Sequence, residues 1–183
     1  MWNDRLDRLD DFPFRRLARL LDGIAPPQGT APIDLSIGEP QHAPPALLAG
    51  TVAAHGHLWN RYPPPAGTPA YRRATAAWLT RRFDLPACAV DPDRHVLPLA
   101  GTKEGLFLLP QIVTPSAGTT PPPLVFVPNP VYPTYVGAAV MAGAEPRYLD
   151  ATAATGFLPE LDRREPTDLD RCSAFFLCSP ANP

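Results

Sequence analysis

The chain has 183 residues, of which 45% are apolar and 19% are charged, a composition typical of a soluble globular protein. Its formal net charge of −2 provides no basic surface for nucleic acid, which proteins hold by neutralising phosphates. No apolar run approaches the ~18 residues that a membrane-spanning helix needs. The 3 cysteines show no CxxC spacing, so they indicate a reducing cytoplasm rather than a disulfide framework or a metal site.

The first 43 residues are predicted to form an arm. Apolar residues repeat at helical spacing over 14–21, which indicates a short amphipathic helix, and Gly23 is expected to end it. Residues 33–37 alternate between apolar and polar side chains, a pattern that predicts a short strand.

Two helices are predicted in the next part of the chain. One is expected over 44–54, because proline is tolerated in a first helical turn. The other is expected over 68–83, where Thr68 can cap the helix and Pro69 can begin it. Three side chains of this second helix are expected to form its buried stripe: Tyr71, Ala74 and Trp78.

From residue 95 onward, predicted strands and helices alternate. The runs at 124–127 and 174–178 are continuously apolar, which is typical of strands that are buried on both faces. The alternation predicts an α/β fold with a mainly parallel sheet and flanking helices. The expected strands are 95–99, 124–127, 146–149 and 174–178, and the expected helices are 102–113 and 132–142.

Three segments lie where predicted strands end, which is the edge at which open α/β sheets bind ligands. Gly101, Thr102 and Lys103 combine small residues, a helix start and a cation, which suit a phosphate, although an ordinary capped helix is the alternative. Tyr132 could stack on a flat ligand or pack on the core. Asn182 could hydrogen-bond a ligand oxygen or mark a turn.

Five segments in order along nearly the whole chain resemble motifs of the pyridoxal-phosphate (PLP) dependent aminotransferases of class I/II, which have the aspartate aminotransferase fold, fold type I. The sequences LSIGEPQHAPP and FLCSPANP are most similar to those of N-succinyldiaminopimelate aminotransferases of lysine biosynthesis. The five segments are Ile33–Pro40, Tyr62–Arg72, Gly101–Glu104, Pro130–Tyr132 and Ser179–Pro183.

The resemblance implies a PLP enzyme that moves an amino group between an amino acid and a 2-oxo acid. Gly101 and Thr102 would hold the phosphate of PLP, with Lys103 beside them. Tyr132 would stack on the pyridine ring, and Asn182 would hydrogen-bond the phenolic oxygen.

The same resemblance implies a homodimer. Tyr62 would reach the phosphate of the partner subunit's cofactor, and Gly38 would lie near the substrate carboxylate. Residues 44–183 would form the first part of the PLP-binding large domain, and residues 1–43 would be an arm that belongs with the small domain.

Lys103 is the only lysine of the chain. The family's Schiff-base lysine follows its N-P-T-G motif, so the resemblance implies that this lysine lies beyond residue 183. Lys103 is not expected to replace it, because a phosphate dianion beside Lys103 would keep its ammonium charged. This chain alone is therefore expected to be inactive. Two alternatives stay open: another fold-type-I PLP enzyme, such as a carbon–sulfur lyase, or a degenerate fragment without catalytic function.

Overall fold

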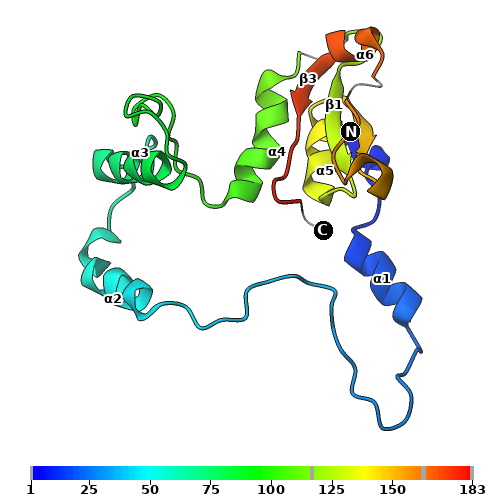
Figure 1. Cartoon of the computed structure of the whole chain (residues 1–183), viewed down its shortest axis with the longest axis horizontal. Helices are drawn as coiled ribbons and strands as arrows, with labels where there is room; N and C mark the ends of the chain where they lie inside the picture. The colour runs from blue at the N-terminus through cyan, green and yellow to red at the C-terminus, as the bar shows by residue number, and fades with distance from the viewer. Residues whose placement is uncertain (1, 116–117, 162–163, 182–183) are drawn as a thin grey trace. The chain divides into compact units, whose positions relative to one another are not determined.

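The computed structural model describes residues 2–115, 118–161 and 164–181 (Figure 1). The chain divides into two compact units, one that combines Met1–Pro32 with Gly101–Pro183 and one that comprises Ile33–Ala100. Within the described ranges, no helix has the length and apolarity that crossing a bilayer requires. The domain boundary expected at residue 43 rests on the family resemblance and stays a prediction.

The first unit contains a three-stranded parallel sheet. Its strands are β1 (Leu124–Asn129), β2 (Glu145–Asp150) and β3 (Cys172–Phe175), and their order is β2-β1-β3. The four side chains of 124–127 are at most 1% exposed, because both faces of the central strand are covered. The predicted α/β class with a parallel sheet is confirmed, although β3 begins and ends earlier than expected.

Two helices cover one face of this sheet. They are α4 (Thr102–Val113) and α5 (Pro133–Met141), which pack against each other. The core on this face is a cluster of seven buried residues that also contacts Leu106 and Phe107 of α4: Val125, Val127, Tyr135, Ala138, Ala139, Ala144 and Phe176.

The opposite face of the sheet has a smaller core. Leu124, Phe126 and Leu149 are buried together there. The short helix α6 (Pro166–Asp170) is tied to this face, since Asp168 lies 3.4 Å from a guanidinium nitrogen of Arg147 in β2. After β2 the chain makes a single 3-10 turn, η3 (Ala153–Thr155).

The amino-terminal segment belongs to the same unit. It contains a 3-10 helix, η1 (Asp4–Arg8), followed by α1 (Pro13–Leu21). Gly23, two residues after the end of α1, adopts a φ of +75°, a conformation that L side chains rarely adopt, so the predicted helix and its stop are confirmed.

The second unit is helical. It contains α2 (Ala46–Ala54), the 3-10 turn η2 (Gly56–Leu58) and α3 (Pro69–Arg82). The hydroxyl of Thr68 accepts a hydrogen bond from the Tyr71 amide at 3.2 Å, as expected for a helix cap.

The strands predicted at 33–37 and 95–99 are wrong, since neither segment is a strand in the structure. In the first, the Ser36 amide donates to the Asp34 carboxylate at 2.9 Å, a local bond that replaces a ladder bond. In the second, Pro98 has no amide hydrogen to donate. Neither segment has a strand partner among the described residues.

The buried stripe predicted for α3 is also wrong. Tyr71 is 49% exposed and Trp78 is 51% exposed, whereas Ala76 is only 6% exposed. The reason is the segment after α3, which lies against the alanine face: Ala76 and Ala77 share a hollow with Ala87, Val90 and Pro92, among others. Spacing along a helix identifies an apolar stripe but not the loop that covers another face.

Candidate functional site

The first part of the site is the start of α4. Gly101 is the residue that precedes the helix, and its backbone is extended. The first amides of a helix have no acceptor within the helix, and they carry a partial positive charge. A Cβ atom added to Gly101 would meet nothing within 4 Å, so space is open beside this helix start. A helix start with open space beside it can receive an anion.

The second part is an aromatic cluster where β1 passes into α5. Tyr132 precedes α5 directly and is 40% exposed. Its ring lies edge-on to Tyr135, with centroids 5.5 Å apart and an interplanar angle of 87°. The Tyr135 ring in turn stacks on Phe176, with centroids 4.2 Å apart. The exposed tyrosine is therefore held against a buried aromatic pair.

The segment after β3 reaches the same place. Burial raises the pKa of the Tyr135 phenol, and the nearby Cys178 and Tyr132 raise it further. The Cys178 thiol donates to the Pro180 carbonyl at 3.2 Å. The chain that leads toward residue 182 thus passes beside the aromatic cluster.

The start of α4 and the start of α5 lie at the same edge of the sheet. The Thr114 hydroxyl, just after α4, is 3.1 Å from the Ser173 hydroxyl at the amino end of β3. α4 therefore begins near the carboxyl end of β3, and in Figure 1 the arrow of β3 points toward that end. α5 begins directly after β1, so its start lies at the carboxyl edge too. This is the edge at which open α/β sheets bind ligands.

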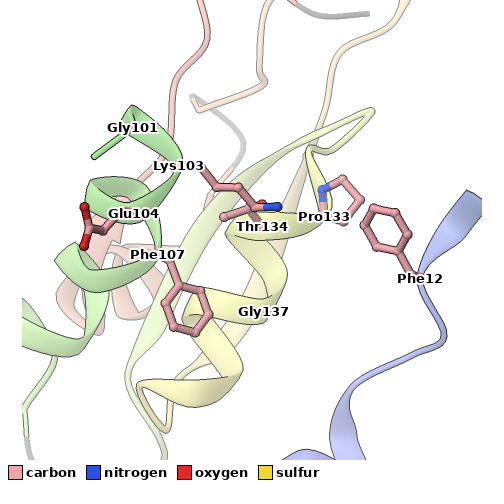
Figure 2. A pocket seen from close by; sticks show the side chains of 8 residues that line it. All are labelled: Phe12, Gly101, Lys103, Glu104, Phe107, Pro133, Thr134 and Gly137. Carbon is pink, nitrogen blue, oxygen red and sulfur yellow. The ribbon is translucent and has the colours of Figure 1, made fainter. Parts of the chain in front are cut away.

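The two helix starts line one hollow of about 590 Å³. This volume is in the range of small-molecule sites. Figure 2 shows Lys103 extending from α4 toward Pro133 and Thr134 of α5, while Glu104 projects from another side of α4. The lining is mostly apolar, and its residues are Phe12, Gly101, Lys103, Glu104, Phe107, Pro133, Thr134 and Gly137.

The structure brings together most of the predicted site residues of the first unit. Gly101 and Lys103 line the hollow, Thr102 lies between them, and Tyr132 immediately precedes the lining residue Pro133. Asn182 lies outside the described residues.

Two predicted site residues belong to the second unit. Gly38 lies in an irregular segment, and a Cβ atom there would meet nothing within 4 Å. The Tyr62 side chain is fully exposed to solvent in the loop before α3. The assignments of both residues stay predictions.

Phe12 is one of the lining residues that sequence reasoning missed. It precedes α1, far from α4 and α5 along the chain, and no local pattern marks it. Thr134 and Gly137 were also missed, although their position in the first turns of the helix after Tyr132 is a signal that could have indicated them.

The hollow fits PLP in chemical terms. A phosphate needs amide donors and positive charge, which the α4 start and Lys103 can supply. A flat ring needs apolar walls, which the hollow supplies. It also needs an accessible aromatic face, which Tyr132 could supply from beside the hollow, since Tyr132 precedes the lining residue Pro133 but does not line the hollow itself. No group of three or more side chains among the described residues could hold a metal ion.

Comparison with known proteins gives a consistent picture. Residues 30–183 match the family model described as aminotransferase class I and II. The chain is 37% identical to the LL-diaminopimelate aminotransferase of Desulforudis audaxviator, over 98% of this chain and 44% of that protein. It is 33% identical to the glutamate-pyruvate aminotransferase AlaC of Escherichia coli, over 98% of this chain and 42% of that protein.

Solved structures agree with these matches. An aminotransferase from Neisseria meningitidis superposes with a TM-score of 0.90 and 36% identity, over 100% of this chain and 45% of that chain. The aminotransferase AspB from Helicobacter pylori superposes with a TM-score of 0.82 and 30% identity, over 96% of this chain and 44% of that chain. The chain thus spans slightly less than half the length of these relatives.

Proposed function

Because the chain belongs to the family of class I and II aminotransferases, we propose that it is the cofactor-binding part of an enzyme that transfers an amino group from an amino acid to a 2-oxo acid. The family and its cofactor, PLP, are those expected from the sequence motifs. The observation that carries the proposal is the hollow at the carboxyl edge of the sheet, into which two helix starts and the only lysine converge.

PLP, when bound, supplies the electron sink for chemistry at the amino acid's α-carbon. The residues of this chain would bind and orient it. The backbone amides at Gly101 and Thr102, the Thr102 hydroxyl and the Lys103 ammonium would hold the phosphate. The ring of Tyr132 would cover one face of the pyridine ring, and Asn182 would hydrogen-bond the phenolic oxygen.

The remaining assignments follow the family resemblance. Tyr62 would contribute to the phosphate site of a partner subunit, which makes the proposed enzyme a homodimer. Gly38 would lie near the substrate carboxylate, where a residue without a side chain leaves room. Lys103 would serve the phosphate and not the covalent chemistry, because the phosphate dianion would keep its ammonium protonated.

The proposed amino donor is a diaminopimelate. Several relatives are named LL-diaminopimelate aminotransferases. Two segments of the sequence resemble enzymes that act on the N-succinyl derivative of the same compound. The N-succinyl form is the narrower prediction. The glutamate-pyruvate aminotransferase among the relatives makes alanine a necessary comparison in any assay.

The test uses the complete protein that contains this chain, loaded with PLP. Formation of glutamate from 2-oxoglutarate is measured with LL-diaminopimelate, its N-succinyl derivative and alanine as donors. Tyr132→Ala is expected to raise the Kd for PLP roughly 2- to 12-fold, the range that corresponds to one lost aromatic contact. The control is Tyr148→Ala, which removes a partly exposed tyrosine from β2.

Absence of PLP-dependent glutamate formation with all three donors would contradict the proposed diaminopimelate or alanine transaminase. Release of pyruvate from a sulfur amino acid without a 2-oxo acid acceptor would instead identify a carbon–sulfur lyase. Equal PLP affinity of Tyr132→Ala and Tyr148→Ala would remove Tyr132 from the site.

A further inference from the structure

We propose that the amino-terminal segment 4–12 is a strap across α5 that holds Phe12 as a wall of the hollow. In this arrangement Phe12 contacts the bound ligand, and Arg5 is a positioning residue that acts through Phe12. The strap itself is independent of the proposed function. Only the identification of the ligand as PLP rests on the proposed function.

One end of the strap is anchored at the carboxyl end of α5. The Arg5 guanidinium donates to the carbonyl of Met141, the last residue of α5, at 2.8 Å. The Arg8 guanidinium donates to the Ala144 carbonyl at 3.4 Å. Carbonyls at the end of a helix lack donors within the helix and carry partial negative charge, so cations stabilise them. Arg5 therefore fixes η1 on the end of α5, and Arg8 fixes it on the segment that follows this helix.

Gly143 makes this anchor possible. A Cβ atom on Gly143 would lie 2.9 Å from a terminal guanidinium nitrogen of Arg5 and 3.1 Å from its central carbon. The guanidinium group thus lies directly against the glycine backbone. Gly143 also has a φ of +82°, which L side chains rarely adopt. Any side chain at this position would displace Arg5.

The other end of the strap lies at the start of α5. Phe12 lines the hollow together with Pro133 and Thr134 of α5 and with Lys103 of α4. Figure 2 shows its ring beside Pro133. The Arg15 amide donates to the Phe12 carbonyl at 2.9 Å, so the beginning of α1 fixes the backbone that carries the ring.

The length of the strap matches the helix it crosses. The 9 residues of α5 span about 13 Å at ~1.5 Å per residue. The four steps from Arg8 to Phe12 reach about 13 Å when extended at ~3.3 Å per residue. The chain between the anchors is not helical. The segment is therefore long enough to run from one end of α5 to the other, and loss of the Arg5 anchor is expected to loosen its hold on Phe12.

Phe12 and Lys103 would contact different parts of one ligand. Lys103 offers charge to a phosphate, and Phe12 offers an apolar surface to the carbon skeleton. This division of contacts predicts that the affinity for inorganic phosphate does not depend on Phe12, whereas the affinity for a ligand with both a phosphate and a ring does.

The first experiment tests the strap in the complete, ligand-free protein. Amide hydrogen exchange of residues 4–12 is compared in the wild type, in Arg5→Ala and in the matched control Arg15→Ala, which removes an exposed arginine from α1. Exchange is expected to be at least about tenfold faster in Arg5→Ala, since one charge-assisted hydrogen bond is lost. Equal exchange in Arg5→Ala and Arg15→Ala would overturn the strap.

The second experiment tests Phe12 at the hollow. The Kd values for PLP and for inorganic phosphate are measured by equilibrium dialysis in the wild type, in Phe12→Ala and in the control Leu20→Ala, which alters an exposed leucine of α1. Phe12→Ala and Arg5→Ala are expected to raise the Kd for PLP roughly 2- to 12-fold and to leave phosphate binding unchanged.

The outcomes separate this inference from the proposed function. A wild-type protein that does not bind PLP would contradict the proposed function and the ligand contact of Phe12, while the exchange experiment still decides the strap. PLP binding that Phe12→Ala leaves unchanged would overturn the ligand contact alone.

Discussion

Tyr135 connects the exposed part of the site to the core. Its ring lies edge-on to Tyr132 and stacks on Phe176, and its side chain is buried while that of Tyr132 is not. Aromatic pairs of these geometries are more favourable than burial alone would make them. Because Tyr135 holds the Tyr132 ring in place, the Tyr132 ring would lose less conformational entropy when it stacks on a ligand.

The raised pKa of Tyr135 makes stability depend on pH at the alkaline end. The pKa of the Tyr135 phenol is higher in the folded protein than its ordinary value of about 10. The free energy of unfolding is therefore undiminished below pH 10, and it falls as the pH rises from there through the folded-state pKa. The urea midpoint of the wild type should therefore fall above pH 10 more steeply than that of Tyr135→Phe. Tyr71→Phe, at a half-exposed tyrosine, is the control and should follow the wild type. Parallel curves for wild type and Tyr135→Phe would refute the prediction.

Individual site residues were predictable where the signal is local. Gly101, Lys103 and Tyr132 each follow a predicted strand or begin a predicted helix, and the structure gathers them at one edge. Phe12 was not predictable, because its place depends on hydrogen bonds between residues 136 positions apart, such as that from Arg5 to Met141. No spacing rule within a helix or strand reports such a contact.

At the scale of elements, the turn before α3 depends on a single glycine. Gly67 has a φ of +73°, its amide donates to the Pro64 carbonyl at 2.8 Å, and its carbonyl accepts from Arg72 at 2.6 Å. A Cβ atom there would lie 2.9 Å from the ring of Pro98. The turn and the segment around Pro98 therefore approach each other as closely as a residue without a side chain allows.

Gly67→Ala is expected to destabilise the protein by about 1–2 kcal/mol from the left-handed backbone alone, with a further cost from the contact with Pro98. The measurement is the free energy of urea unfolding. Gly50→Ala is the matched control, and its expected effect on the free energy of unfolding has the opposite sign. Gly50 lies inside α2 with nothing within 4 Å of its Cβ position, so alanine there should stabilise by up to ~1 kcal/mol. Equal effects of the two substitutions would show that the turn tolerates a side chain.

Helices were easier to predict than strands for a physical reason. A helix satisfies its own amides, so caps such as Thr68 and the stop at Gly23 mark it locally. A strand needs a partner, and the segments 33–37 and 95–99 have none among the described residues. The apolar run 124–127 was predictable because only a fully buried strand accommodates it.

At the scale of the whole molecule, the chain covers 44% of the Desulforudis audaxviator relative and 45% of the Neisseria meningitidis structure. The proposed transaminase activity therefore belongs to the complete protein. Several large apolar side chains of the second unit are exposed, among them Trp59 and Tyr62.

The isolated 183-residue chain is predicted to bind PLP weakly and reversibly and to transfer no amino group. The physical reason is that its only lysine, Lys103, would remain an ammonium ion beside the phosphate dianion. The measurement is mass spectrometry after borohydride reduction in the presence of PLP, with inorganic phosphate as competitor, together with a transaminase assay. A stable pyridoxyl adduct on Lys103, or turnover, would prove the prediction wrong.

The contact between Arg5 and Met141 also bears on how the protein is made. η1 precedes the second unit along the chain, and the carbonyls that the two arginines bind emerge from the ribosome only after all of the second unit has been synthesised. Closing a loop of this length costs entropy that grows only slowly with its size. Segment 4–12 can therefore dock late in translation at modest cost.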